Sequence, residues 1–352
     1  MSKPRINIDP VHYPQHNYLW FCHDVLVSIL EYSDEHQMSM ETITFPSEEK
    51  ADEFSAVPQE PRLQHNWFME NGWKEEMYLI YYKHTFFSLL ADFCQYMYES
   101  INCASEMKVA VAYALLRKPL RDNLYYIEWL YVNRDEVIDI LLTGKPIQLE
   151  INCEKARERI EAARQKSGIS AFEDMYTFRY DKNDDCSLEK IWNKANHLVT
   201  THRYTKTKQG ELNFIYSNEE DLQWYIEQYY LAVSYIMGYV AELASRMFEE
   251  MTSFNFYTKM INKYNRAMRM TQMSDSVAGR TTLGKFAYPQ FPIVCPRCGK
   301  KQPLNHKGMR MLLANKYRCH RCWKTIHTSR YIFDFEKLKI NKSEEDKTIT
   351  EE

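Results

Sequence analysis

A long apolar stripe constrains the fold more than any other feature of the sequence. Between Leu222 and Met247, apolar residues recur at alternating steps of four and three, which places them on one side of an α-helix. Tyr225, Ala232 and Tyr239 widen the stripe, as expected for a helix in a bundle more than for a coiled-coil seam. No strand-like alternation of comparable strength occurs before residue 280. The sequence therefore predicts an all-α bundle.

Other segments complete the predicted bundle. We expect helices over residues 73–102, 105–132 and 187–204, and we expect the striped helix to continue to about Met270. Pro119 should kink the second of these helices or mark a boundary in it. The segment before residue 73 contains several prolines, and we interpret residues 33–72 as a loop with at most a short helix.

Composition limits the function classes to which the chain can belong. Apolar residues make up 45% and charged residues 26%, as in ordinary globular proteins, and no apolar run approaches the roughly 18 residues of a membrane-spanning helix. The first residues lack the apolar core of a signal peptide, so we expect a cytoplasmic protein without membrane contact. Glycine is scarce, at 9 residues, and no Walker loop, H-E-x-x-H or G-x-S-x-G motif occurs. Nucleotide hydrolysis and metalloprotease chemistry are therefore unsupported.

Charge is divided unevenly along the chain. From Lys259 to Arg330 there are 16 Lys and Arg against one acidic residue, Asp275, which gives a net charge of +15. Residues 1–258 contain 25 basic and 40 acidic residues, a net charge of −15. This partition predicts a basic module that meets a polyanion, joined to an acidic body that does not. The alternative is that the basic module docks on the acidic body.

Four of the nine cysteines are spaced as metal ligands. Cys295 and Cys298 form one C-x-x-C pair, and Cys319 and Cys322 form a second pair after twenty intervening residues. Two such pairs can bring four thiolates to one tetrahedral centre, a geometry that Zn²⁺ accepts without a competing preference. Because four protein ligands leave no open position, we predict one structural zinc ion. A rubredoxin-like iron site and a disulfide pair are the alternatives, of which a cytosolic location disfavours the disulfides.

The cysteine pattern resembles a zinc ribbon, which implies a small module of short β-strands. We therefore expect an all-α helical bundle with a small C-terminal zinc-ribbon module. The predicted parts are an acidic bundle over residues 1–270, a linker over 271–292, the ribbon over 293–335 and a charged tail over 336–352. Three histidines near the cysteines are interpreted as surface residues: His306, His320 and His327.

The predicted ribbon is strongly basic. Between Val294 and Arg330 there are ten Lys and Arg and no acidic residue. Lys and Arg contacts to phosphates give salt-dependent, largely sequence-independent affinity, and aromatic rings stack on bases. The predicted nucleic-acid-binding residues are Lys300, Lys301, Lys307, Arg310, Arg318, Arg321, Trp323 and Lys324, with Tyr317 as a further stacking ring. The alternative is a protein-docking module whose basic face is merely solvated.

Two helical segments of the body carry arginine and histidine. Arg117 and Arg121 lie four residues apart, so we expect them on one side of a helix. In the helix expected over residues 187–204, His202 falls on the apolar face and His197 on an adjacent polar face. The alternative is structural: the arginines pair with acidic residues of the body, such as Glu128 or Asp122, and the histidines are core or surface residues.

An arginine–polar dipeptide on one helix and a histidine on a later helix resemble the HEPN-type all-helical proteins of bacterial toxin–antitoxin and antiviral defence systems. The resemblance implies metal-independent RNA cleavage. Arg121 with Asp122 or Asn123 would match the start of the family motif, and His197 or His202 would stand for its histidine. An imidazole can take a proton from the ribose 2′-hydroxyl or give one to the leaving oxygen, and an arginine can stabilise charge on the phosphate. The family keeps arginine and histidine close together on one helix, whereas residues 122–128, directly after Arg121, contain no histidine, so the site is either split between helices or lost.

Two functions follow from these features. The first is an effector or toxin-like ribonuclease of a bacterial defence or toxin–antitoxin system, with a zinc ribbon that binds RNA or DNA. Its candidate catalytic residues are Arg121, His197, His202, Asn196 and Arg117. The second is a non-enzymatic adaptor or sensor that binds nucleic acid or a protein partner, with a bundle that oligomerises through the Leu222–Met247 stripe. The HEPN likeness covers roughly residues 75–250 and implies a homodimer.

Overall fold

The structure is a computed structural model of the 352-residue chain. It describes residues 6–39, 44–142, 154–169, 172–184, 187–201, 206–213, 219–254, 256–278, 291–295, 297–304, 307–308, 311, 316–326 and 339–340.

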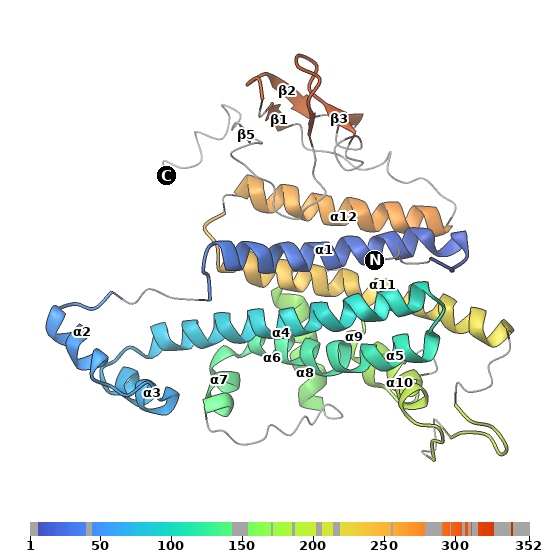
Figure 1. Cartoon of the computed structure of the whole chain (residues 1–352), viewed down its shortest axis with the longest axis horizontal. Coiled ribbons are helices and arrows are strands. Elements are labelled where there is room, and N and C mark those ends of the chain that lie inside the picture. Colours follow the sequence, from blue (N-terminus) through green and yellow to red (C-terminus); the bar gives the residue numbers. More distant parts are fainter. Residues whose placement is uncertain are drawn as a thin grey trace. The chain divides into compact units, whose positions relative to one another are not determined.

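The chain is all-α with a small β module near its C-terminus, which confirms the fold class expected from the sequence (Figure 1). The helices are α1 (Tyr13–Glu35), α2 (Glu48–Ser55), α3 (Pro61–Glu70), α4 (Lys74–Ser105), α5 (Val109–Arg117), α6 (Leu124–Val132), α7 (Arg134–Leu142), α8 (Glu154–Lys166), α9 (Met175–Tyr180), α10 (Leu188–Asn196), α11 (Glu219–Glu250) and α12 (Phe256–Ala278). A 3-10 turn, η1 (Pro10–His12), precedes α1, and a π-helical turn, η2 (Lys118–Asn123), joins α5 to α6.

The chain divides into two compact units, each built from segments that are distant in the sequence. The first unit contains Met1–Ile8 and Leu30–Leu243, and the second contains Asp9–Ile29 and Ala244–Glu352. α1 and α11 each contribute residues to both units. The basic segment identified from the sequence belongs to the second unit.

The first unit is built around α4 and α11. Phe86, Leu90 and Phe93 of α4 have no exposed surface, and α4 packs along α5, η2 and α6. From Ile226 onward, every residue of the apolar stripe predicted on α11 is buried. Two polar contacts fix α11 against this core: Ser100 and Tyr229 share a hydrogen bond of 2.8 Å between their hydroxyls, and the Tyr113 hydroxyl donates to the carbonyl of Tyr225.

Two helices, α2 and α3, occupy the segment over residues 33–72 that we expected to be mainly loop. α2 begins after Ser47, whose hydroxyl accepts from the amide of Lys50, and α3 begins with Pro61. Proline is well tolerated at a first helical position because that amide has no partner inside the helix. The loop interpretation of residues 33–72 is therefore wrong: its prolines stand at helix starts and between helices.

The expected continuous helix from Leu222 to Met270 is interrupted. α11 ends at Glu250, and α12 begins at Phe256 and continues to Ala278. At the end of α11, the amide of Met251 donates to the carbonyl of Phe248 and the Thr252 hydroxyl donates to that of Glu249. These short-range bonds use carbonyls that a continuing helix would need, so the helix stops there.

Pro119 produces a π-helical turn. Proline has no amide hydrogen, so the regular bonding of the helix fails at this position, and the amide of Leu124 bonds instead to the carbonyl of Pro119. Side chains of α9 bind two neighbouring carbonyls: Arg179 donates to Leu120 at 3.2 Å, and the Tyr180 hydroxyl donates to Arg121 at 2.7 Å. The irregular turn therefore serves as the docking point for α9.

A buried ion pair lies beside this turn. Arg179 and Glu128 have no exposed side-chain surface, and the Arg179 Nη2 atom lies 2.7 and 2.6 Å from the two carboxylate oxygens. The Tyr239 hydroxyl of α11 donates to the same carboxylate at 2.9 Å. Residues from α6, α9 and α11 are thus joined in one buried polar cluster.

The second unit contains helices and two β-hairpins. The guanidinium of Arg269 on α12 lies 5.3 Å from the ring centroid of Phe21 on α1. β1 (Phe291–Val294) pairs antiparallel with β2 (Lys301–Leu304) and with β5 (Lys339–Ile340), and β3 (Tyr317–Arg318) pairs antiparallel with β4 (Thr325–Ile326). Each hairpin loop holds one C-x-x-C pair.

We expect Arg179→Ala to lower the free energy of unfolding by about 3–5 kcal/mol, because it leaves a buried carboxylate without its counter-charge. Urea unfolding followed by circular dichroism measures the loss. The double variant Arg179→Met, Glu128→Leu removes both charges and should be less destabilised than Arg179→Ala. A single variant as stable as the wild type would show that the pair contributes nothing to the core.

Candidate metal centre and basic surface

Two equivalent turns present the four cysteines. In the first, the amide of Gly299 donates to the carbonyl of Cys295 at 2.9 Å, and the amide of Cys295 donates to Lys300 at 3.0 Å. In the second turn, the amide of Trp323 donates to the carbonyl of Cys319 at 2.9 Å, and the amide of Cys319 donates to the carbonyl of Lys324 at 3.0 Å. The same hydrogen bonds occur at the same spacing, so both turns direct a pair of sulfurs in the same way.

The four sulfur atoms form one cluster. All lie within 4.8 Å of one another; Cys295 and Cys322 are 3.5 Å apart, and Cys298 and Cys319 are 3.6 Å apart. The sulfurs of a tetrahedral Zn²⁺ site are about 3.8 Å apart, given Zn–S bonds of about 2.3 Å, whereas a disulfide bond is about 2.0 Å long. The cysteines are thus free thiols that lie close enough together to bind a metal ion.

Hydrogen bonds favour the thiolate at one of these positions. Burial opposes ionisation of Cys319, but the backbone amides of Cys322 and Arg321 donate to its sulfur and lower its pKa to about 6. At Cys298, an amide contact from Lys300 favours the thiolate, but burial and the three neighbouring sulfurs outweigh it and raise the pKa to about 11. Four thiolates in one cluster repel one another, and a bound cation would remove that repulsion.

No other group of three or more metal-ligating side chains meets among the residues that the structure describes. His320 is exposed and lies outside the cluster, as its interpretation as a surface residue requires. His306 and His327 fall outside the described residues.

Basic side chains surround the cysteine turns. Seven of the eight predicted nucleic-acid-binding residues are described, and all seven are exposed: Lys300, Lys301, Lys307, Arg318, Arg321, Trp323 and Lys324. Arg310 lies outside the described residues. Tyr317 is only 4% exposed, so the expectation that its ring stacks on a base is wrong: it lies in the small core of the module.

The predicted catalytic residues occupy separate places. Arg121 of η2 pairs with Asp122 at 3.0 Å and with Glu189, in the first turn of α10, at 3.3 Å. His197 directly follows the last residue of α10 and is exposed. A helix rises about 1.5 Å per residue, so the partner of Arg121 lies about 12 Å along α10 from His197.

The remaining candidates form no site with these two. Arg117 and Asn196 are exposed, and the Asn196 amide donates to the carbonyl of Trp192 at 2.8 Å. His202 lies outside the described residues. The helix expected over residues 187–204 ends at Asn196, because His197 takes up an extended conformation. Neither Arg117 nor Arg121 bonds to a histidine in the described part of the chain, so RNA cleavage stays a prediction.

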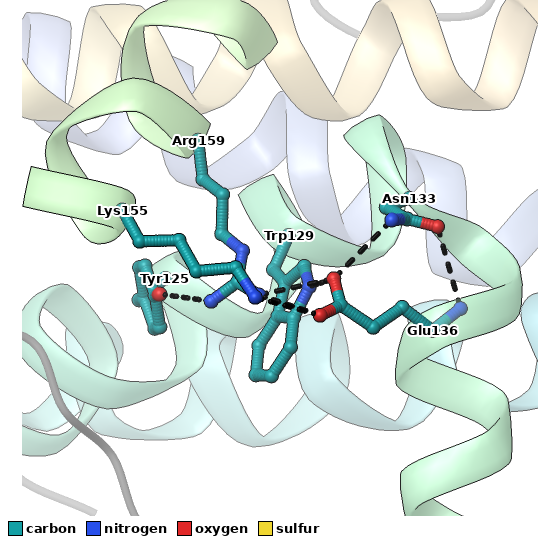
Figure 2. A network of polar contacts seen from close by, with 6 residues as sticks. All are labelled: Tyr125, Trp129, Asn133, Glu136, Lys155 and Arg159. Atoms are coloured by element: carbon teal, nitrogen blue, oxygen red, sulfur yellow. Dashed lines mark hydrogen bonds and ion pairs between the residues drawn. The ribbon is translucent and has the colours of Figure 1, made fainter.

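A polar network that the sequence did not reveal lies between α6, α7 and α8 (Figure 2). The Glu136 carboxylate accepts hydrogen bonds from the Trp129 indole at 2.7 Å and from Asn133 at 3.2 Å. It also pairs with Lys155 at 3.1 Å and with Arg159 at 2.9 Å. Trp129, Asn133 and Glu136 follow one another at helical steps of four and three. This spacing is the sequence signal that could have indicated the network.

Arg159 completes the network. Its guanidinium lies 3.7 Å from the Trp129 ring centroid and donates to the Tyr125 hydroxyl at 2.9 Å. Burial alone would raise the pKa of Glu136, but the hydrogen bonds from Trp129 and Lys155 and the charge of Arg159 lower it. Both carboxylate oxygens already have partners within the protein, so the network holds α8 against α6 and α7 and leaves no acceptor for a substrate.

Comparison with models of known protein families, with curated proteins and with solved structures finds no match to this chain. The resemblance to HEPN-type proteins therefore gains no support from them. Each helix in the described ranges is too short or too polar to cross a membrane.

We expect Cys319→Ser to reduce metal binding from one ion per chain to a small fraction of that value, because a hydroxyl is a poor substitute for a thiolate. Native mass spectrometry of the zinc-loaded protein measures the stoichiometry. Cys103→Ser is the matched control, since Cys103 lies on α4 outside the cluster. Equal metal content in the two variants would contradict the assignment of the cluster.

We expect Glu136 to make stability depend on pH. Its pKa is lower in the folded than in the unfolded chain, so its stabilisation is present above about pH 4.5 and is lost as the pH falls through the folded pKa. The difference in unfolding free energy between wild type and Glu136→Gln should be largest at neutral pH and shrink toward acid. Urea unfolding between pH 7 and 3 measures it, with exposed Glu220→Gln as the control. A difference independent of pH would contradict the assignment.

Proposed function

We propose that the C-terminal module is a zinc-dependent nucleic-acid-binding module. Cys295, Cys298, Cys319 and Cys322 would hold one Zn²⁺, and the exposed basic side chains around the two turns would contact phosphates. The observation that carries the proposal is the set of exposed Lys and Arg side chains around four clustered thiols. The sequence from Val294 to Arg330 contains no acidic residue that could neutralise them.

The chemistry of the ligand set favours zinc. Thiolates are soft ligands that suit zinc and iron–sulfur centres, and the short separations between sulfurs fit a tetrahedral tetrathiolate. Four protein ligands leave no position open for water, so the ion would be structural. The strands described in the module are only two to four residues long, so metal binding would supply much of its folding free energy.

The charge of the module favours a polyanion. Ten Lys and Arg lie between Val294 and Arg330, and a zinc ion with four thiolates would subtract only two charges from this total. The side chains of Lys301 on β2 and of Arg318 on β3 are both exposed, and those of Lys300, Arg321 and Lys324 are exposed on the turns. Phosphate contacts by such side chains depend strongly on salt and little on sequence.

We expect the triple variant Lys301→Ala, Arg318→Ala, Lys324→Ala to bind nucleic acid more weakly. The slope of log K against log salt should become shallower by about one for each phosphate that the variant no longer neutralises. Fluorescence anisotropy with labelled RNA and DNA between 50 and 300 mM salt measures both effects. The control variant Lys74→Ala, Lys108→Ala, Lys208→Ala removes three exposed lysines of the first unit and should leave affinity unchanged.

Two outcomes would overturn the proposal. The first is equal affinity in the two triple variants, and the second is no binding of any nucleic acid by the zinc-loaded protein. The second outcome would favour the protein-docking alternative.

A further inference from the structure

The residue after the second cysteine differs between the two turns, although their hydrogen bonds make it equivalent. The residue after the second cysteine has a left-handed backbone in both turns: Gly299 with φ of 67° and Trp323 with φ of 59°. Each donates its amide to the first cysteine of its own turn. Glycine adopts this conformation without strain, whereas a bulky aromatic residue rarely does.

Space does not explain the difference. A Cβ atom at Gly299 would meet no atom within 4 Å, so the advantage of glycine at this position is conformational. Trp323 therefore bears a backbone strain that the first turn avoids. Strain of this kind persists where a side chain has a use that outweighs it.

Burial does not compensate for the strain. Trp323 is 72% exposed, more than any other large hydrophobic side chain that the structure describes. Its sequence neighbours Arg321 and Lys324 are exposed cations, as is Arg318 on β3. An exposed indole among cations offers a flat apolar face beside groups that could bind phosphate, and no ring or hydrogen-bond partner among the described residues of the module holds its side chain.

We propose that the module binds single-stranded nucleic acid, with the Trp323 ring stacked on an unpaired base and the neighbouring cations on the adjacent phosphates. This inference rests on the proposed nucleic-acid-binding function and adds the class of strand. In a duplex the faces of the bases are already stacked, so they are not offered to the indole, whereas a single strand exposes them. The turn that holds the metal ligand Cys322 also fixes the backbone of Trp323, so zinc binding would set the orientation of the ring.

The test compares strands that differ in their bases but not in their phosphates. Zinc-loaded full-length protein is titrated with 12-nucleotide single-stranded DNA, the same RNA strand, an abasic strand of equal length, and a 12-base-pair duplex. We expect both single strands to bind at least about fivefold more tightly than the abasic strand, the effect of one stacked base, and to quench tryptophan fluorescence. Comparison of the DNA and RNA arms gives the preference between the two.

Trp323→Gly is the decisive variant, because glycine relaxes the strained turn and should keep the fold and the zinc. It should bind single strands about 5- to 150-fold more weakly than the wild type, bind the abasic strand equally well, and lose the quenching. Trp323→Phe keeps a ring and should retain part of the affinity. Circular dichroism and zinc content verify that each variant is folded.

The outcomes separate this inference from the function on which it rests. Salt-dependent binding that is equal for normal and abasic strands, or unchanged in Trp323→Gly, would overturn the stacking inference and leave the nucleic-acid-binding function intact. Tighter binding to the duplex than to the single strands would do the same. Absence of binding to every strand would overturn both.

Discussion

The buried guanidinium of Arg179 is the constraint around which the first unit is organised. A charge with no exposed surface is costly unless a counter-charge and hydrogen-bond acceptors meet it inside the protein. Glu128 supplies the counter-charge, and the Leu120 carbonyl in the π-helical turn supplies a further acceptor. Tyr239 completes the carboxylate shell from α11. Helices α6, α9 and α11 must therefore pack in one relative arrangement, since any other would leave a buried charge without its partner.

The β-hairpins of the second unit depend on a different constraint, the clustering of four thiols. Their strands are only two to four residues long, and the four thiols are held within 4.8 Å of one another. A bound metal ion would remove the repulsion between thiolates and join the two short hairpins. In the part of the module that the structure describes, many side chains are exposed. These include the Lys and Arg residues and Trp323, and the two proposals depend on them.

Two arginines of the body, Arg121 and Arg159, are paired with carboxylates of neighbouring helices. Arg121 would suit phosphate stabilisation, but its guanidinium pairs with Glu189 and Asp122. Arg159 and Glu136 form a comparable network, and both are bound to partners from neighbouring helices. These pairs orient helices against one another. In the described residues, the exposed cations on which the proposed function depends gather instead on the basic surface of the C-terminal module.

The helical class, the buried stripe of α11 and the four-cysteine cluster were predictable from the sequence, because each depends on spacing between residues that are near in the chain. The sequence also indicated the basic surface, since charge excess follows from composition. Sequence analysis missed α2 and α3 because proline is common both in loops and at the first position of a helix, and the sequence alone does not distinguish the two cases. The structure was needed to show that Arg121 pairs with Glu189, that α10 ends before His197, and that Trp323 has a left-handed backbone. Those features depend on contacts between distant residues and on backbone conformation, and neither leaves a periodic signal in the sequence.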